Sequence, residues 1–101
     1  MAINTPRNLA RTAAATSSVT LYTVPAATTA VLTSIWVTNT TASTQTFTIA
    51  VNGVAFLAAS PLAGNSSVAI DVKQVVAATQ TITGFASNTG VIFHLSGMEI
   101  V

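Results

Sequence analysis

The sequence predicts an all-β protein that folds as a single β-sandwich. Valine and threonine recur along the whole chain, and their branched Cβ atoms favour strands over helices. Apolar and polar residues alternate, most clearly over residues 46–51 and 67–73. Turn-forming residues separate such segments about every ten residues. These observations favour about seven to eight short antiparallel strands in a jelly-roll or immunoglobulin-like sandwich.

The expected strands share this alternation or a run of β-branched residues. They are expected at 19–24, 30–38, 46–51, 54–58, 66–73, 80–86 and 91–99. Asn52-Gly53 predicts a hairpin with a type I′ turn, because both residues tolerate the positive φ that this turn needs. Turns are also expected at 63–67 and 87–90, and residues 75–80 predict a short helical turn.

The N-terminal residues 1–18 lack a clear period and contain Arg7 and Arg11. We expect an extended N-terminal arm there, followed by the sandwich domain over residues 19–101.

The composition is unusually poor in charge. Of 101 residues, 50% are hydrophobic and 5% are charged, with a net charge of +1, whereas soluble domains carry about 25% charged residues. Threonine, serine, asparagine and glutamine must keep such a chain in solution. We therefore expect much of its surface to be covered by partners or by further copies of the chain.

Composition also argues against several functional classes. No apolar run reaches the roughly 18 residues of a membrane span, and the N-terminus lacks the apolar stretch of a signal peptide. Two arginines near one end are too few for a nucleic-acid footprint. There is no cysteine, and no motif for catalysis, a metal or a cofactor is found. The sequence predicts no enzyme, no cofactor, no nucleic-acid partner and no membrane partner.

Several phrases resemble a group of small tailed-bacteriophage virion proteins: "TLYTVPAATTAVLTSIWVTNTTAST", "VNGVAFL", "NSSVAIDVKQVVAATQTI" and the terminal "HLSGMEI". The resemblance spans nearly the whole chain and rests on structural phrases. It implies a β-sandwich protein of the virion, assembled in the bacterial host cytoplasm. Members of the group include head decoration, or cement, proteins and other small virion components.

The charges of the N-terminal segment and the expected strand faces indicate which residues contact a partner. We expect Arg7 and Arg11 to anchor the arm on a neighbouring subunit or on the capsid. In "VLTSIWVT", alternation places Val31, Ile35 and Val37 on one face and Leu32 and Trp36 on the other. Leu32 and Trp36, together with Tyr22, are therefore the expected apolar contacts, although Trp36 fits a second, covered face of the domain equally well.

The other ionisable residues are expected to be ordinary surface side chains. His94 is expected on the strand face of Ile92, Ser96 and Met98, as a partly exposed or hydrogen-bonded side chain. Asp71 is expected beside Lys73 as a surface pair.

Two functions from different classes remain. The first is a structural virion protein, a capsid decoration or cement subunit that binds the major capsid protein or other virion proteins. We expect it to be a homo-oligomer, preferably a homotrimer, because closed symmetry hides sheet edges. The alternative is a tail-fibre, neck or baseplate β-domain that binds a host glycan or another tail protein. A free immunoglobulin-like domain acting inside the host is a weaker third possibility.

Overall fold

The computed structural model describes residues 4–101, and all regular structure within them is β-strand. Eight strands follow one another: β1 (Asn4–Ala13), β2 (Val19–Thr23), β3 (Thr29–Asn39), β4 (Gln45–Val51), β5 (Val54–Leu62), β6 (Ser66–Val76), β7 (Thr81–Ala86) and β8 (Val91–Ile100). No helix in this part of the chain is long and apolar enough to cross a membrane.

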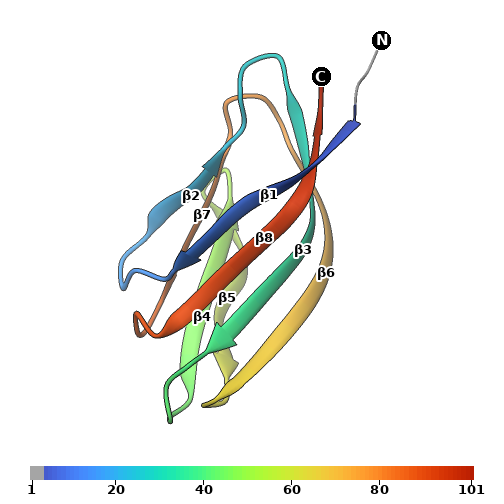
Figure 1. The fold of residues 1–101 in the computed structure, drawn as a ribbon. Coiled ribbons are helices and arrows are strands. Elements are labelled where there is room, and N and C mark those ends of the chain that lie inside the picture. The colour runs from blue at the N-terminus through green and yellow to red at the C-terminus, as the bar shows by residue number, and fades with distance from the viewer. Residues whose placement is uncertain (1–3) are drawn as a thin grey trace.

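The strands form two four-stranded antiparallel sheets. The first sheet has the order β1-β8-β3-β6, and the second has the order β2-β7-β4-β5 (Figure 1). The strands pair as they would in one long hairpin that curls into a sandwich. The pairs are β1–β8, β2–β7, β3–β6 and β4–β5. This order is that of a jelly roll, so the sandwich is not immunoglobulin-like.

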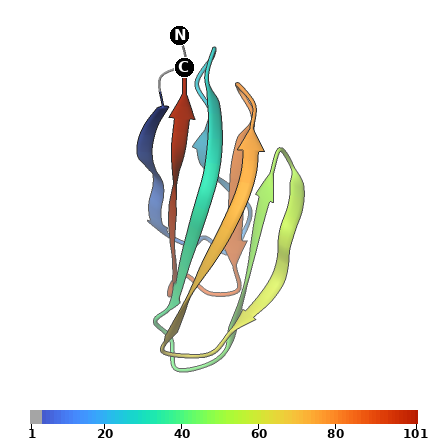
Figure 2. The ribbon, with the colours of Figure 1, turned by 90° about the vertical axis from the view of Figure 1, so that its right-hand side faces the viewer.

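The sandwich is elongated, with extents of 48 × 21 × 18 Å. Asn4 pairs with Ile100, so the first described residues and the C-terminus lie at the same end of the molecule (Figures 1 and 2).

The core lies between the two sheets and is almost entirely apolar. Phe93 of the first sheet meets Phe47 of the second in an edge-to-face contact, with ring centroids 6.3 Å apart. The other large buried side chains come from both sheets and include Leu32, Ile35, Ile49, Ile82 and Leu95. Burial of alternate residues on facing strands is what the period of two in the sequence predicts.

The predicted strands agree with the structure, whereas one connecting segment and the N-terminal segment differ from the prediction. All seven expected strands are present, and the Asn52-Gly53 turn has φ values of 51° and 78°, as a type I′ turn requires. The helical turn expected at 75–80 is wrong, because β6 continues to Val76 and a turn closed by a bond from Gln80 N–H to the Ala77 carbonyl follows.

The segment expected to be an N-terminal arm also differs from the structure. Residues 4–13 form β1, an edge strand paired with β8 along its length. Leu9 and Ala14 are buried in the core, which gives this segment a packed side. A register shift between Asn8 and Ala10 interrupts its alternation, which explains why the sequence shows no clear period there.

Candidate functional site

Trp36 lies on the outer face of the first sheet, near its middle. Its side chain is 51% exposed, while Ile35 and Val37 on either side are fully buried. The covered-face reading of Trp36 therefore does not hold within one chain. Tryptophan is one of the residue types that contribute most of the binding energy when a partner covers them at the centre of an interface.

Leu32 does not share this outer face, contrary to the sequence prediction. It is fully buried beside Ile35 and Val37, and Val31 takes the partly exposed position instead. The pairing of β3 with both neighbours shifts between Leu32 and Ser34, so one extra residue, Thr33, reverses the alternation at this point. Leu32 is thus a core residue and is not available for contact with a partner.

The strand register aligns exposed side chains on both sides of Trp36. We call one set of four residues, directly opposite one another across β1, β8, β3 and β6, the Trp36 row. It consists of Arg11, His94, Trp36 and Ala69. All four are exposed.

The adjacent row, which we call the Asp71 row, lies two residues further along β8. It consists of Asn8, Ser96, Ser34 and Asp71. Asn8, Ser96 and Asp71 are exposed. The two rows place exposed charges near both edges of the sheet and an aromatic pair at its centre.

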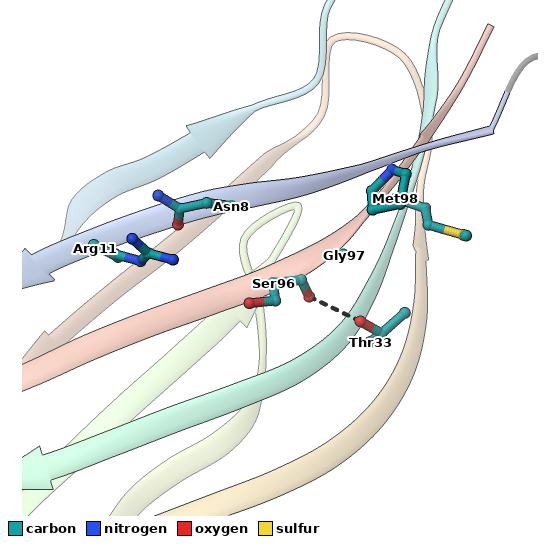
Figure 3. A pocket seen from close by; sticks show the side chains of 7 residues that line it. Asn8, Arg11, Thr33, Ser96, Gly97 and Met98 are labelled. Atoms are coloured by element: carbon teal, nitrogen blue, oxygen red, sulfur yellow. Dashed lines mark hydrogen bonds between the residues drawn. The ribbon is translucent and has the colours of Figure 1, made fainter.

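The outer face is hollowed on both sides of Thr33. One hollow, of about 490 Å³, is lined by residues that include Asn8, Arg11, Ser96 and Met98. Figure 3 shows Asn8 and Arg11 on β1 beside Ser96 on β8, where Thr33 donates a 3.1 Å hydrogen bond to the Ser96 carbonyl. The second hollow, of about 560 Å³, lies towards β6 and is lined by Thr33, Asp71, Val72 and Lys73.

The two arginines expected to anchor an arm both belong to β1. The backbone of Arg7 pairs with Gly97, but its side chain lies outside the described part of the structure. Arg11 is exposed in the Trp36 row. The sequence thus identified Trp36 and Arg11 as contact residues but did not identify Asn8, Ser96 and Asp71 as such, because only the register of the strands places them together on this face.

Tyr22 joins the two sheets instead of standing free on the surface. It is half-buried on β2, packs against the core, and its hydroxyl donates a hydrogen bond to the Glu99 carboxylate on β8. Glu99 is 8% exposed, so this bond lies largely out of solvent. The contact fixes β2 of the second sheet against β8 of the first.

Tyr22→Phe is expected to lower the free energy of unfolding by about 1.5–3 kcal/mol, because it removes a donor from a largely buried carboxylate. Urea denaturation of the purified variant measures the loss. In a Glu99→Gln background the same substitution should cost about 1 kcal/mol, as for a neutral hydrogen bond. An equal cost in both backgrounds would contradict the assigned bond.

The outer face of the second sheet is uncharged. None of the strands β2, β4, β5 and β7 contains an acidic residue, a lysine, an arginine or a histidine. Alternation and register place small or uncharged side chains outward, among them Thr20, Thr83, Ala50 and Ala55, which are opposite one another across the sheet. When a protein surface covers such a face, no charged side chain is removed from water, so the desolvation cost is small.

No group of three or more histidine, cysteine or acidic side chains that could hold a metal ion is present in residues 4–101. The candidate site consists of the two outer faces of the sandwich.

Comparisons with known proteins support the fold. No family model and no curated protein sequence matches the chain. A chain from the crystal structure of the T13 IBDV viral particle has a TM-score of 0.59 and 9% sequence identity, covering 98% of this chain and 30% of that chain. This chain thus spans less than a third of that neighbour.

Two further solved structures have lower scores. CBM35 from Paenibacillus barcinonensis has a TM-score of 0.42 at 10% identity, covering 97% of this chain and 88% of that one. A pentameric capsid protein from metagenomic phage sequences has a TM-score of 0.37 at 12% identity, covering 97% and 59%. At these identities the likeness is one of fold, and the chain is a β-sandwich similar to one within a viral particle.

Proposed function

We propose that this chain is a structural virion protein that works through protein–protein contacts, as a capsid decoration or cement subunit. The observation that carries the proposal is the uncharged outer face of the second sheet, in a chain with 5% charged residues. A face of this kind is poorly protected against association when it stays in solvent. The resemblance to phage virion proteins and the fold shared with a viral-particle chain agree with this role.

The edge strands of the sandwich are poorly suited to pairing with another chain, which favours contacts through the outer faces of the sheets. Pro6 on β1 and Pro61 on β5 lack the backbone N–H that pairing with a further strand uses, and Lys73 lies on β6. Ala59 of β5 has a φ of 46° beside a register shift, and β2 has only 5 residues. These features hinder the addition of a further strand, so we assign contact with other virion proteins to the outer faces.

The proposal includes partners, symmetry and location. The partners are the major capsid protein or other virion proteins, the chain forms a homo-oligomer with a trimer as the preferred state, and its place is the virion. A closed trimer offers the same uncharged face three times, so contacts that are weak singly add up. No catalytic role is assigned.

Mass spectrometry of purified virions tests the role by counting copies. A head-covering subunit is expected in hundreds of copies per particle, whereas a handful would favour the tail-fibre, neck or baseplate alternative. Absence of the chain from purified particles would contradict a virion role altogether.

Thr83→Lys is expected to weaken binding to the particle at least tenfold, because it places a charge in the middle of the uncharged face. Co-sedimentation of the variant with particles measures binding. Thr44→Lys is the matched control, since Thr44 is exposed in the loop between β3 and β4. Equal binding of both variants would show that this face does not contact the particle.

A further inference from the structure

We propose that the outer face of the first sheet binds the same face of a second copy across a two-fold axis. The inference extends the proposed function, since it rests on the view that the faces of this chain are covered by protein, and it names the occupant of the face that carries Trp36. In a trimeric protein this contact would join two trimers.

The symmetry of the face suggests this occupant. Consider a two-fold axis between the copies, parallel to the strands and midway between β8 and β3. It lays β8 over β3 of the second copy, and β1 over β6 of the second copy, because the order of the sheet is β1-β8-β3-β6. Each strand row then faces the same row in reverse order, as an isologous contact requires.

In the Trp36 row, this arrangement places Trp36 opposite His94 of the second copy, and His94 opposite Trp36 of the second copy. The contact therefore contains two equivalent indole–imidazole pairs at its centre. Aromatic pairs add to the energy of area burial when they stack or meet edge to face. Trp36 is 51% exposed in the single chain, so it has area to bury.

In the Asp71 row, Asn8 comes to face Asp71 of the second copy. Arg11 lies one row away, about 7 Å along the strand, which is within reach of a long side chain. The hollow beside Arg11 lies over the hollow beside Asp71 of the second copy, which leaves space for the guanidinium to meet the carboxylate. Each dimer would contain this charge pair twice.

The same pair cannot form within one chain. Arg11 lies on β1 and Asp71 on β6, at opposite edges of the sheet and three strand spacings apart, or about 14 Å. Any energetic coupling between the two residues must therefore come from contact between copies.

The area is adequate for a specific contact. Four strands of 10, 10, 11 and 11 residues form the face, and at about 4.8 Å between strands and about 3.4 Å per residue they cover about 600 Å² per copy. Two copies would bury about 1,200 Å², the lower end of the range for specific interfaces.

A charge-exchange experiment tests the contact. Arg11→Asp and Asp71→Arg are each expected to weaken self-association about thirtyfold in sedimentation equilibrium, because both copies of the pair become repulsive. An equimolar mixture of the two variants should regain wild-type affinity. In the mixed dimer both charge pairs are attractive again, because the introduced carboxylate at position 11 faces the introduced guanidinium at position 71 of the other chain, and the native Asp71 faces the native Arg11.

Trp36→Ala should weaken the association at least a hundredfold, as expected for a central tryptophan. Trp36 is the only tryptophan of the chain, so its fluorescence should shift to shorter wavelength as the wild-type concentration rises. Unchanged urea denaturation midpoints in all three variants would serve as the folding control, because the substituted side chains are exposed.

A wild-type chain that stays monomeric at high concentration would overturn the contact, as would a variant mixture that does not reassociate or a monomer whose Trp36 fluorescence responds to glycans. A trimer that is indifferent to Trp36→Ala would overturn this contact alone. In that case the proposed virion role would stand, because copy number in the particle tests it independently.

Discussion

Asn39→Asp is expected to destabilise the protein by about 3–5 kcal/mol at neutral pH, because an oxygen would replace a buried amide group that only donates. Asn39 is fully buried at the end of β3. Its Nδ2 donates to the carbonyls of Ser43 at 2.9 Å, Leu62 at 3.0 Å and Ala63 at 3.3 Å. Its Oδ1 accepts from the N–H of Thr41 at 2.9 Å and from the Thr41 hydroxyl at 2.7 Å.

These bonds tie the loop after β3 to the turn between β5 and β6, so one side chain orders two connections. In the variant, the carbonyls of Ser43 and Leu62 would lose their donor and face a carboxylate. Burial and these carbonyls should raise the pKa of the introduced carboxyl above its value in the unfolded chain. The loss of stability should therefore be largest above the raised pKa and should shrink as the pH falls through it.

Urea denaturation between acidic and neutral pH measures both effects. Asn88→Asp is the matched control, since Asn88 is exposed and its Oδ1 only accepts a 2.8 Å bond from the N–H of Gly90. A carboxylate can do the same, and the control should change stability by less than about 0.5 kcal/mol. Equal losses in the two variants would contradict the role given to the Asn39 amide.

Gly97→Ala is expected to destabilise the protein by about 3 kcal/mol or more, because a Cβ at this position would run into the neighbouring strand. The added carbon would lie 2.2 Å from the Val31 carbonyl oxygen and 3.0 Å from Leu9 Cδ1. The obstacle at Val31 is backbone held in the sheet beside the shift at Thr33, so β3 or β8 must move.

Thermal unfolding should show the effect as a fall in Tm of more than about 10 °C. Gly53→Asn is the control, because nothing lies within 4 Å of a Cβ at Gly53 and asparagine tolerates its positive φ of 78°. The control should remain within about 1 kcal/mol of the wild type. A Gly97→Ala variant with wild-type stability would show that β3 and β8 are not held in this register.

The sequence predicts the strands well because alternation and turn chemistry are local. Val68, Ile70 and Val72 do turn inward together, and Asn52-Gly53 does form the expected turn. The order of the strands depends on pairing between distant segments, so the alternation could not distinguish a jelly roll from an immunoglobulin-like sandwich. β1 escaped recognition because its proline, arginines and register shift obscure the alternation.

The candidate site could be predicted only in part, for a related reason. A single extra residue at Thr33 exchanges the faces of Val31 and Leu32, and the sequence carries no local signal of it. Asn39 could have been found, because it continues the inward alternation of Ile35 and Val37. The neighbours of Trp36 belong to three other strands, so only the register brings Arg11, His94 and Ala69 beside it.

The central claim is that this nearly uncharged sandwich works with its two outer faces covered by protein. Cryo-electron microscopy of particles that carry the chain tests it most directly. We expect the threonine-rich outer face of the second sheet against another virion protein and Trp36 within a contact between copies. Density in which both faces stand in solvent, with the chain attached only through a terminus or a loop, would contradict the account.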